Sequence, residues 1–139
     1  MSTINDEITI NSTPAKAFEA LTTQAGYRAW WNKLAEVPAN VGGEARLEFN
    51  KEGQIIKMRF RIDAQVYNER VKWTCTGHDM ASWIGTTLDW KLRSNGSQVT
   101  VALEHAGWKE AAPEPVKQGW KHFLGSLKTY LEGGAGQPW

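Results

Sequence analysis

The sequence predicts one domain of the α+β class, in which a curved antiparallel sheet of about six strands packs against a long C-terminal helix. Two observations support this prediction. Between residues 44 and 105, apolar residues recur at every second position in successive segments, as in strands with one buried face. Between residues 113 and 134 they recur at helical spacing instead. A chain of 139 residues can bury its own hydrophobic core, so residues 1–139 are assigned to a single domain.

The N-terminal part predicts one strand followed by two short helices. Isoleucines alternate with polar residues over 3–11, which is typical of a half-buried strand. Residues 11–14, Asn-Ser-Thr-Pro, supply capping side chains and a proline suited to a helix start. We expect Gly26 to interrupt this first helix and a second short helix to cover 27–31.

Five further strands are predicted, separated by short polar turns. Apolar side chains share one parity in each strand and charged side chains the other, so one face of the sheet is expected to be buried. Residues 77–82 are expected to form a loop. The predicted strands cover 44–49, 56–66, 71–75, 84–92 and 99–105.

The C-terminal helix is predicted from Pro113 to Gly134. Its apolar side chains fall within an arc of about 120° on a helical wheel. Pro113 suits the first helical position, and Gly133 and Gly134 supply a stop signal. At about 30 Å this helix is long enough to lie diagonally across the sheet. One helix does not easily fill the concave side of such a sheet, so a pocket between them is expected, opening along Gly119, Phe123 and Ser126.

Composition excludes several classes of function. Lys and Arg number 16 against 15 for Asp and Glu, so there is no overall charge to attract nucleic acid or an anionic membrane. The single Cys75 excludes an internal disulfide, and the N-terminus lacks the features of a signal peptide, which predicts a cytoplasmic location. No apolar run approaches the roughly 20 residues of a membrane-spanning helix. Nucleotide-binding and nucleophile-elbow motifs are absent, so no cofactor and no enzyme class are predicted.

Eight tryptophans are the unusual feature of the composition. Large aromatic residues with inward parity are usually core residues. If a cavity exists, however, the same residues line it, because small-molecule sites combine aromatic walls with a few polar groups. The candidate ligand-binding residues are Trp31, Phe49, Phe60, Trp73, His78, Trp83, Trp90, His105, Gly119, Trp120 and Phe123.

His105 is the one candidate for catalysis. Its parity places it on the buried face, where it would serve as an acid or base or as a polar contact for a ligand. The favoured alternative is a structural histidine at a strand end, bonded to the backbone. Cys75, His78 and Asp79 form a weak metal-ligand pattern without a second cysteine or a paired histidine, so no metal site is predicted. The parity of Cys75 buries its thiol, which argues against a nucleophile.

Several strings are similar to a known family when taken together and in order. They are Trp30-Trp31, Gly42-Gly43, the segments 71–75 and 83–90, Glu-His-Ala-Gly-Trp at 104–108, and the Gly-Trp to Glu-Gly-Gly-Ala-Gly-Gln-Pro region at 119–138. Together they resemble the family related to the C-terminal domain of activators of heat shock protein ATPase. That family belongs to the START-like, SRPBCC or Bet v 1-like superfamily, and the resemblance covers essentially the whole chain.

The resemblance implies a helix-grip fold, in which a curved antiparallel sheet grasps the C-terminal helix around a hydrophobic cavity. The leading functional hypothesis is therefore binding of a small, largely hydrophobic ligand. Two alternatives stay open: a chaperone-associated protein-interaction module, and a cyclase- or dehydrase-like enzyme acting on an aromatic or polyketide-like substrate. Gly125, on the polar side of the helix, slightly favours the interaction module, and a homodimer is also compatible with the sequence.

Overall fold

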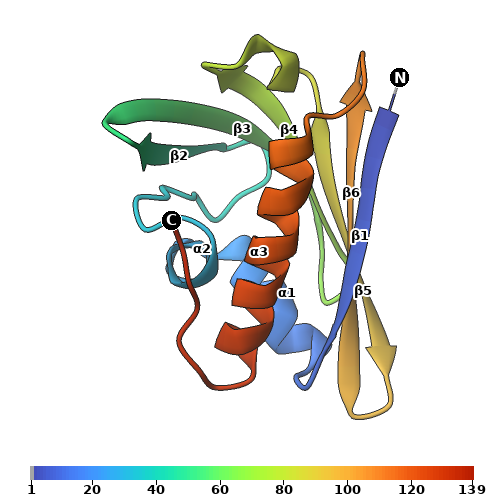
Figure 1. Cartoon of the computed structure of the whole chain (residues 1–139). Helices are drawn as coiled ribbons and strands as arrows, with labels where there is room; N and C mark the ends of the chain where they lie inside the picture. The colour runs from blue at the N-terminus through green and yellow to red at the C-terminus, as the bar shows by residue number, and fades with distance from the viewer. Residues whose placement is uncertain (1) are drawn as a thin grey trace.

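A six-stranded antiparallel sheet curves around the C-terminal helix in the computed structural model, which describes residues 2–139 (Figure 1). The strands follow the spatial order β1-β6-β5-β4-β3-β2. They are β1 (Ser2–Ile10), β2 (Glu44–Lys51), β3 (Gln54–Val66), β4 (Arg70–His78), β5 (Thr87–Asn95) and β6 (Gln98–Trp108). The helices are α1 (Pro14–Thr22), α2 (Gln24–Trp30) and α3 (Glu114–Leu131), with a short 3₁₀ turn, η1 (Ala81–Trp83). The predicted α+β class and helix-grip fold are confirmed.

The break between the two short helices lies at Thr23, not at Gly26 as predicted. Thr23 ends α1 and caps α2, where its hydroxyl accepts the Gly26 N–H at 3.0 Å. Gly26 is instead a helical residue at a close approach of the two helices. A Cβ there would lie 2.7 Å from the Ala20 Cα, so the side chain is excluded by packing rather than by helix termination.

The segment between β4 and β5 differs from the prediction. β4 continues to His78, and η1 overlaps the end of the stretch expected to be a loop, residues 77–82. β5 begins only at Thr87, so Ile84 lies outside it and is 48% exposed. The physical reason is Gly85, which adopts a φ of +91° and donates its N–H to the Cys75 carbonyl at 2.8 Å. This turn folds Trp83 back against the core, where it is buried.

β3 keeps its predicted parity only along its middle. Met58, Phe60 and Ile62 are buried, whereas Val66, predicted to point inward, is 43% exposed. The register of β3 against β4 shifts between Arg59 and Phe60 and again between Ile62 and Ala64. Each shift is a local irregularity of the ladder that bends the strand, and after the second one the alternation of buried and exposed residues is lost.

The ends of α3 lie close to their predicted positions. Pro113 is the residue before the first helical turn rather than the first helical residue, because its backbone is extended and α3 starts at Glu114. At the other end Gly133 adopts a φ of +97°, the left-handed conformation that stops a helix, as predicted. The predicted apolar stripe is buried along the helix at Trp120, Leu124 and Leu127.

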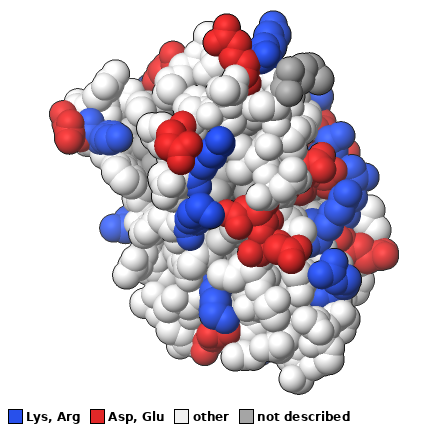
Figure 2. All heavy atoms as spheres, turned by 45° about the vertical axis from the view of Figure 1, so that its right-hand side comes forward, with Lys and Arg blue, Asp and Glu red and all other residues white. Residues whose placement is uncertain are grey.

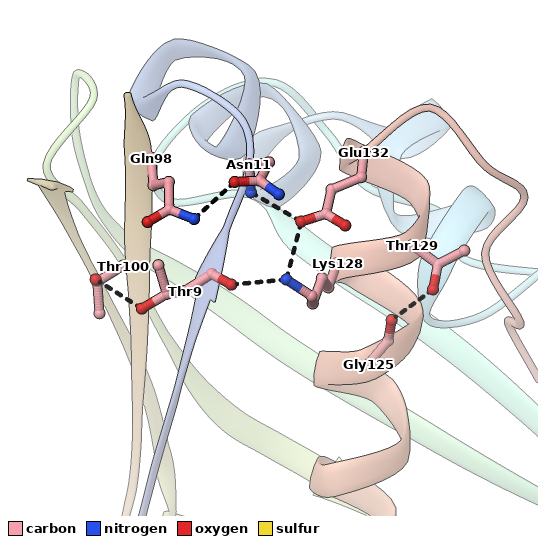
Figure 3. Close-up of polar contacts among 8 residues, drawn as sticks. All are labelled: Thr9, Asn11, Gln98, Thr100, Gly125, Lys128, Thr129 and Glu132. Atoms are coloured by element: carbon pink, nitrogen blue, oxygen red, sulfur yellow. Dashed lines mark hydrogen bonds and ion pairs between the residues drawn. The ribbon is translucent and has the colours of Figure 1, made fainter. Parts of the chain in front are cut away.

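A polar network ties the C-terminal end of α3 to the end of β1 (Figure 3). The Lys128 ammonium donates to the Thr9 carbonyl at 3.0 Å and pairs with Glu132 at 2.9 Å. The same Glu132 oxygen accepts the Asn11 N–H at 2.9 Å, and this bond and Lys128 lower the pKa of Glu132. The helix is thus anchored at its C-terminal end, and the pocket described below opens at its N-terminal end.

Charged residues cover the outside without a dominant sign. Figure 2 shows acidic and basic side chains interspersed over the face on which β1 lies. One of the ion pairs, Lys121 with Asp6 at 3.9 Å, links α3 to β1. In the part of the chain that the structure describes, no helix combines the length and apolar character needed to cross a membrane.

Candidate functional site

An apolar pocket of about 220 Å³ lies between the N-terminal half of α3, the β2–β3 hairpin, η1 and the C-terminal segment, residues 132–139, which follows α3. α3 contributes Gly119, Trp120 and Phe123, the last two because they fall on its buried stripe. A Cβ on Gly119 would meet nothing within 4 Å, so the missing side chain leaves space in this wall. The predicted ligand-binding residues that line the pocket are Trp31, Phe49, His78, Trp83, Gly119, Trp120 and Phe123.

The other predicted ligand-binding residues lie in the core, away from the pocket lining. They are Phe60, Trp73, Trp90 and His105, all at most 1% exposed. Trp73 packs against Tyr27 and Phe60 with ring centroids 4.8 and 5.5 Å apart, and Trp90 packs against Trp30 and Trp120. Phe49, which lines the pocket, has the same inward strand parity as Phe60, Trp73 and Trp90, so parity does not separate a wall of the pocket from the centre of the core.

The pocket follows the predicted side of α3 only in part. Gly119 and Phe123 line it, but Ser126 does not. The Ser126 hydroxyl donates to the Trp30 carbonyl at 2.7 Å and accepts the Gln137 N–H at 2.6 Å. Ser126 therefore joins α3 to α2 and to the C-terminal segment.

The C-terminal segment closes one side of the pocket, a position that no pattern in the sequence predicted. Trp139 donates its backbone N–H to the Trp31 carbonyl at 2.9 Å and its indole N–H to the Asn50 carbonyl at 3.0 Å. Gly136 permits this path, since a Cβ there would lie 2.3 Å from the Ala29 carbonyl oxygen. In the sequence this segment shows only a tryptophan, Trp139, after a stretch rich in glycine and ending in proline. Such a stretch does not predict which part of the fold the tryptophan packs against.

Further lining residues come from the β2–β3 hairpin, from the segment between β4 and η1, and from the start of α3. They are Lys51, Ile56, Met58, Met80, Pro113, Pro115 and Val116. Ile56 and Met58 follow the inward parity of β3, but Met80 lies in the segment predicted to be a loop. Pro113 and Pro115 lie where the chain enters α3. Periodic patterns of apolar residues did not predict that these prolines line the pocket.

A larger depression, of about 540 Å³, lies beside this pocket but has a different character. Its lining mixes acidic and basic side chains, including Glu36, Arg46, Glu48, Lys57 and Arg59, most of them exposed. Small-molecule sites are usually apolar with few polar groups. The smaller apolar pocket is therefore the candidate site.

His105 lies at the centre of a buried hydrogen-bond chain. Its Nδ1 accepts the indole N–H of Trp120 at 3.0 Å, and its Nε2 lies 3.0 Å from the Thr86 hydroxyl oxygen. Thr86 donates its own proton to the Trp83 carbonyl at 2.7 Å, so its oxygen accepts from Nε2–H of His105. Both ring nitrogens bond to side chains rather than to the backbone, which differs from the structural alternative expected from the sequence.

This geometry defines the protonation state of His105. Nε2 carries the proton and Nδ1 is an acceptor, so the imidazole is neutral. Burial, with a smaller contribution from the nearby His78, lowers the pKa of His105 to about 3. Neither nitrogen is free to take or give a proton to a substrate, so the arrangement does not favour a role in acid–base catalysis.

His78, at the end of β4, lines the candidate site and also the larger depression beside it. Its ring stacks on Trp83 with centroids 4.7 Å apart and an interplanar angle of 13°. Its Nδ1 accepts the Met80 N–H at 2.7 Å. Burial lowers the pKa of His78 to about 4, an effect that the charge of Asp79 opposes. Within residues 2–139 the buried Nε2 atom has no hydrogen-bond partner.

Cys75, His78 and Asp79 do not converge on one point. The Cys75 thiol is buried and lies 3.5 Å from the Gly77 carbonyl, and burial raises its pKa to about 11. A thiol with so high a pKa is a poor nucleophile and a poor metal ligand. Asp79 accepts the Lys57 N–H at 2.9 Å. Among the described residues, no group of three or more His, Cys, Asp or Glu side chains is placed to hold a metal ion.

Comparison with known families agrees with this fold. The family described as "Activator of Hsp90 ATPase homolog 1-like protein" matches residues 11–132. The chain belongs to this family. The resemblance drawn from the tryptophan and glycine strings is confirmed, and the activator of Hsp90 ATPase homolog 1-like domain here spans most of the chain. No curated protein gives a significant match to the sequence.

Solved structures extend the comparison. The solution structure of the Aha1 dimer from Colwellia psychrerythraea is 32% identical, with a TM-score of 0.81 over 96% of this chain and 98% of that one. Protein CV1439 from Chromobacterium violaceum is 23% identical, with a TM-score of 0.84 over 95% and 99% of the two chains. DynU16, from the dynemicin biosynthetic locus, is 18% identical, with a TM-score of 0.77 over 98% of this chain and 49% of that one. The last two likenesses concern the fold alone.

Proposed function

We propose that this protein binds a small, largely apolar molecule in the pocket at the N-terminal half of α3. The observation that carries the proposal is the lining, which is aromatic and aliphatic apart from His78 and one charged side chain, Lys51, at its edge. A surface of this kind gains free energy by excluding water, at roughly 25 cal/mol per Å² of apolar area. Such pockets are the usual sites of small-molecule binding.

The size of the pocket limits the ligand. Its volume of about 220 Å³ is below the roughly 300–1,000 Å³ of sites for drug-sized molecules. A dry apolar cavity of about 150 Å³ accommodates benzene in another protein. The ligand is therefore a compact molecule, such as a single substituted aromatic ring or a short acyl chain.

Filling the pocket from α3 is expected to abolish binding. A Gly119→Leu side chain would occupy the open space beside Phe123, and we expect the affinity for indane, an apolar probe, to fall at least about tenfold. Gly125→Leu is the matched control, since Gly125 is also a glycine of α3 with nothing within 4 Å of a Cβ, but it lies outside the pocket. Titrations are followed through the indole N–H signals of the tryptophans by NMR.

The affinities of the variants for indane show whether the probe binds in this pocket or elsewhere on the protein. Equal affinities in Gly119→Leu and the wild type would place the probe elsewhere. Failure of the wild type to bind indane or any other compact apolar probe would remove the proposed function. Thermal unfolding of both variants verifies that they fold.

Association with a protein partner is the second candidate function. Met80 and Trp139 line the pocket yet are 45% and 44% exposed, so its rim presents apolar side chains to a partner. The relative from Colwellia psychrerythraea is described as a dimer, which makes a second copy of this chain the first partner to test. The family description also keeps a chaperone among the proposed partners.

Self-association is measured by sedimentation velocity over a range of concentrations. We expect the wild type to show a concentration-dependent dimer and Met80→Glu to lower the dimer fraction. A sedimentation coefficient that stays at the monomer value throughout would exclude self-association through this rim.

A further inference from the structure

Every polar side-chain group left unpaired in the pocket lining is a hydrogen-bond donor. The tryptophans of the lining carry indole N–H groups, and Lys51 carries an ammonium. Two of the indoles are already engaged, Trp120 with His105 and Trp139 with the Asn50 carbonyl. Among the described residues, the lining includes no carboxylate, amide or hydroxyl side chain. The side chains of the lining therefore offer a donating ligand no acceptor stronger than a methionine sulfur, and a cation would meet Lys51 without a balancing acidic side chain.

Among the described residues, His78 contributes a lining donor that is buried and has no partner. Its Nδ1 accepts the Met80 N–H, so the neutral ring carries its proton on Nε2. Nε2 is buried and finds no acceptor in residues 2–139. The stack on Trp83 holds the ring in one orientation, so no freedom is lost when this N–H is used.

A buried donor without a partner lowers the stability of the unliganded protein, and an acceptor supplied by a ligand removes this penalty. Sites built in this way discriminate against analogues that lack the polar atom. Building on the proposed function, we infer that the ligand joins its apolar body to a hydrogen-bond acceptor that takes the Nε2–H of His78. The chemical class is a compact ketone, ester or carboxylate rather than a hydrocarbon, an alkylammonium or a purely donating molecule.

Two probes of nearly identical shape test this inference. Acetophenone and α-methylstyrene differ only in C=O against C=CH2, so just one of them offers an acceptor. His78→Phe keeps a flat ring for the stack on Trp83 but removes the N–H. We expect the ratio of the two dissociation constants to shift by about 3- to 10-fold between the wild type and His78→Phe, the value of one hydrogen bond. The difference in hydration of the probes cancels in this comparison.

The affinity for α-methylstyrene is expected to be unchanged in His78→Phe, which also shows that the pocket is intact. His78→Gln restores an N–H near the same position and is expected to recover part of the preference. In the wild type, acetophenone but not α-methylstyrene is expected to shift the imidazole ¹⁵N and N–H signals of His78.

The outcomes distinguish this inference from the function on which it rests. Equal ratios in the wild type and His78→Phe, with both probes binding, would overturn the role of His78 and leave the apolar pocket standing. An unshifted His78 signal in the acetophenone complex would overturn it as well, even if His78→Phe failed to fold. Failure of both probes to bind the wild type would overturn the proposed function together with the inference.

Discussion

Replacing His105 with leucine is expected to lower the free energy of unfolding at pH 7 by about 2–4 kcal/mol. The substitution removes the acceptor of the Trp120 indole N–H and the donor to Thr86, both in a region that excludes water. An unpaired buried N–H retains its full desolvation cost, which is larger than the net value of the hydrogen bond it has lost. Urea denaturation followed by tryptophan fluorescence measures the change.

A double variant tests whether the loss of stability comes from the hydrogen bond between Trp120 and His105. Adding Trp120→Phe to His105→Leu removes the unpaired N–H, so the two substitutions together are expected to cost less than the sum of their separate costs. His122→Leu is the matched control, since His122 is an exposed histidine of the same helix as Trp120, and its effect is expected to be within about 0.5 kcal/mol. Strict additivity of the pair would contradict the hydrogen-bond chain.

Acidification is expected to destabilise the protein between about pH 6.5 and pH 4. Burial holds the pKa of His105 at about 3 and that of His78 at about 4, whereas both lie near 6.5 in the unfolded chain. In this range the unfolded state binds protons that the folded state does not, so stability falls as pH falls. Each histidine contributes up to about 1.4 kcal/mol per pH unit. Urea midpoints at several pH values and constant ionic strength give the slope.

The His105→Leu variant is the control for this slope. It is expected to lose the contribution of His105 while keeping that of His78, so its stability varies less steeply with pH. Identical slopes in the variant and the wild type would contradict the assignment. Below pH 4, Asp89 extends the loss of stability. Burial alone would raise the pKa of this carboxylate, but the hydrogen bond and the charge of Arg70 outweigh burial, so the pKa is lowered. The stability from a lowered carboxylate pKa is lost as the pH falls through that pKa.

Local patterns in the sequence predicted most of the fold. Alternation identified the buried face of the sheet at residues such as Leu47 and Phe60, and helical spacing identified the buried stripe of α3 at Trp120. These predictions succeeded because a strand or a helix presents one face to the core, so its sequence records which face is apolar. They failed where a backbone turn breaks the repeat, as at Gly85 before β5.

The same patterns predicted part of the candidate site. Phe49 and Phe60 share inward parity on neighbouring strands, but only Phe49 lines the pocket. The difference is set by how far along the sheet α3 and the C-terminal segment extend. That distance depends on contacts such as Lys128 with Thr9 and Trp139 with Asn50, which join residues far apart in the sequence.

The sequence by itself determined the α+β class, the buried faces of the sheet and of α3, and the likeness to activators of Hsp90 ATPase. Only the tertiary structure decided that His105 is hydrogen-bonded to Trp120 and Thr86, whereas His78, a residue of the pocket lining, has an Nε2 atom with no partner among residues 2–139. The physical reason is that the direction of a side chain, toward the interior or toward solvent, depends on its own strand or helix, so periodicity in the sequence predicts it. The partner it meets there depends on other elements, whose positions are set by packing across the whole fold.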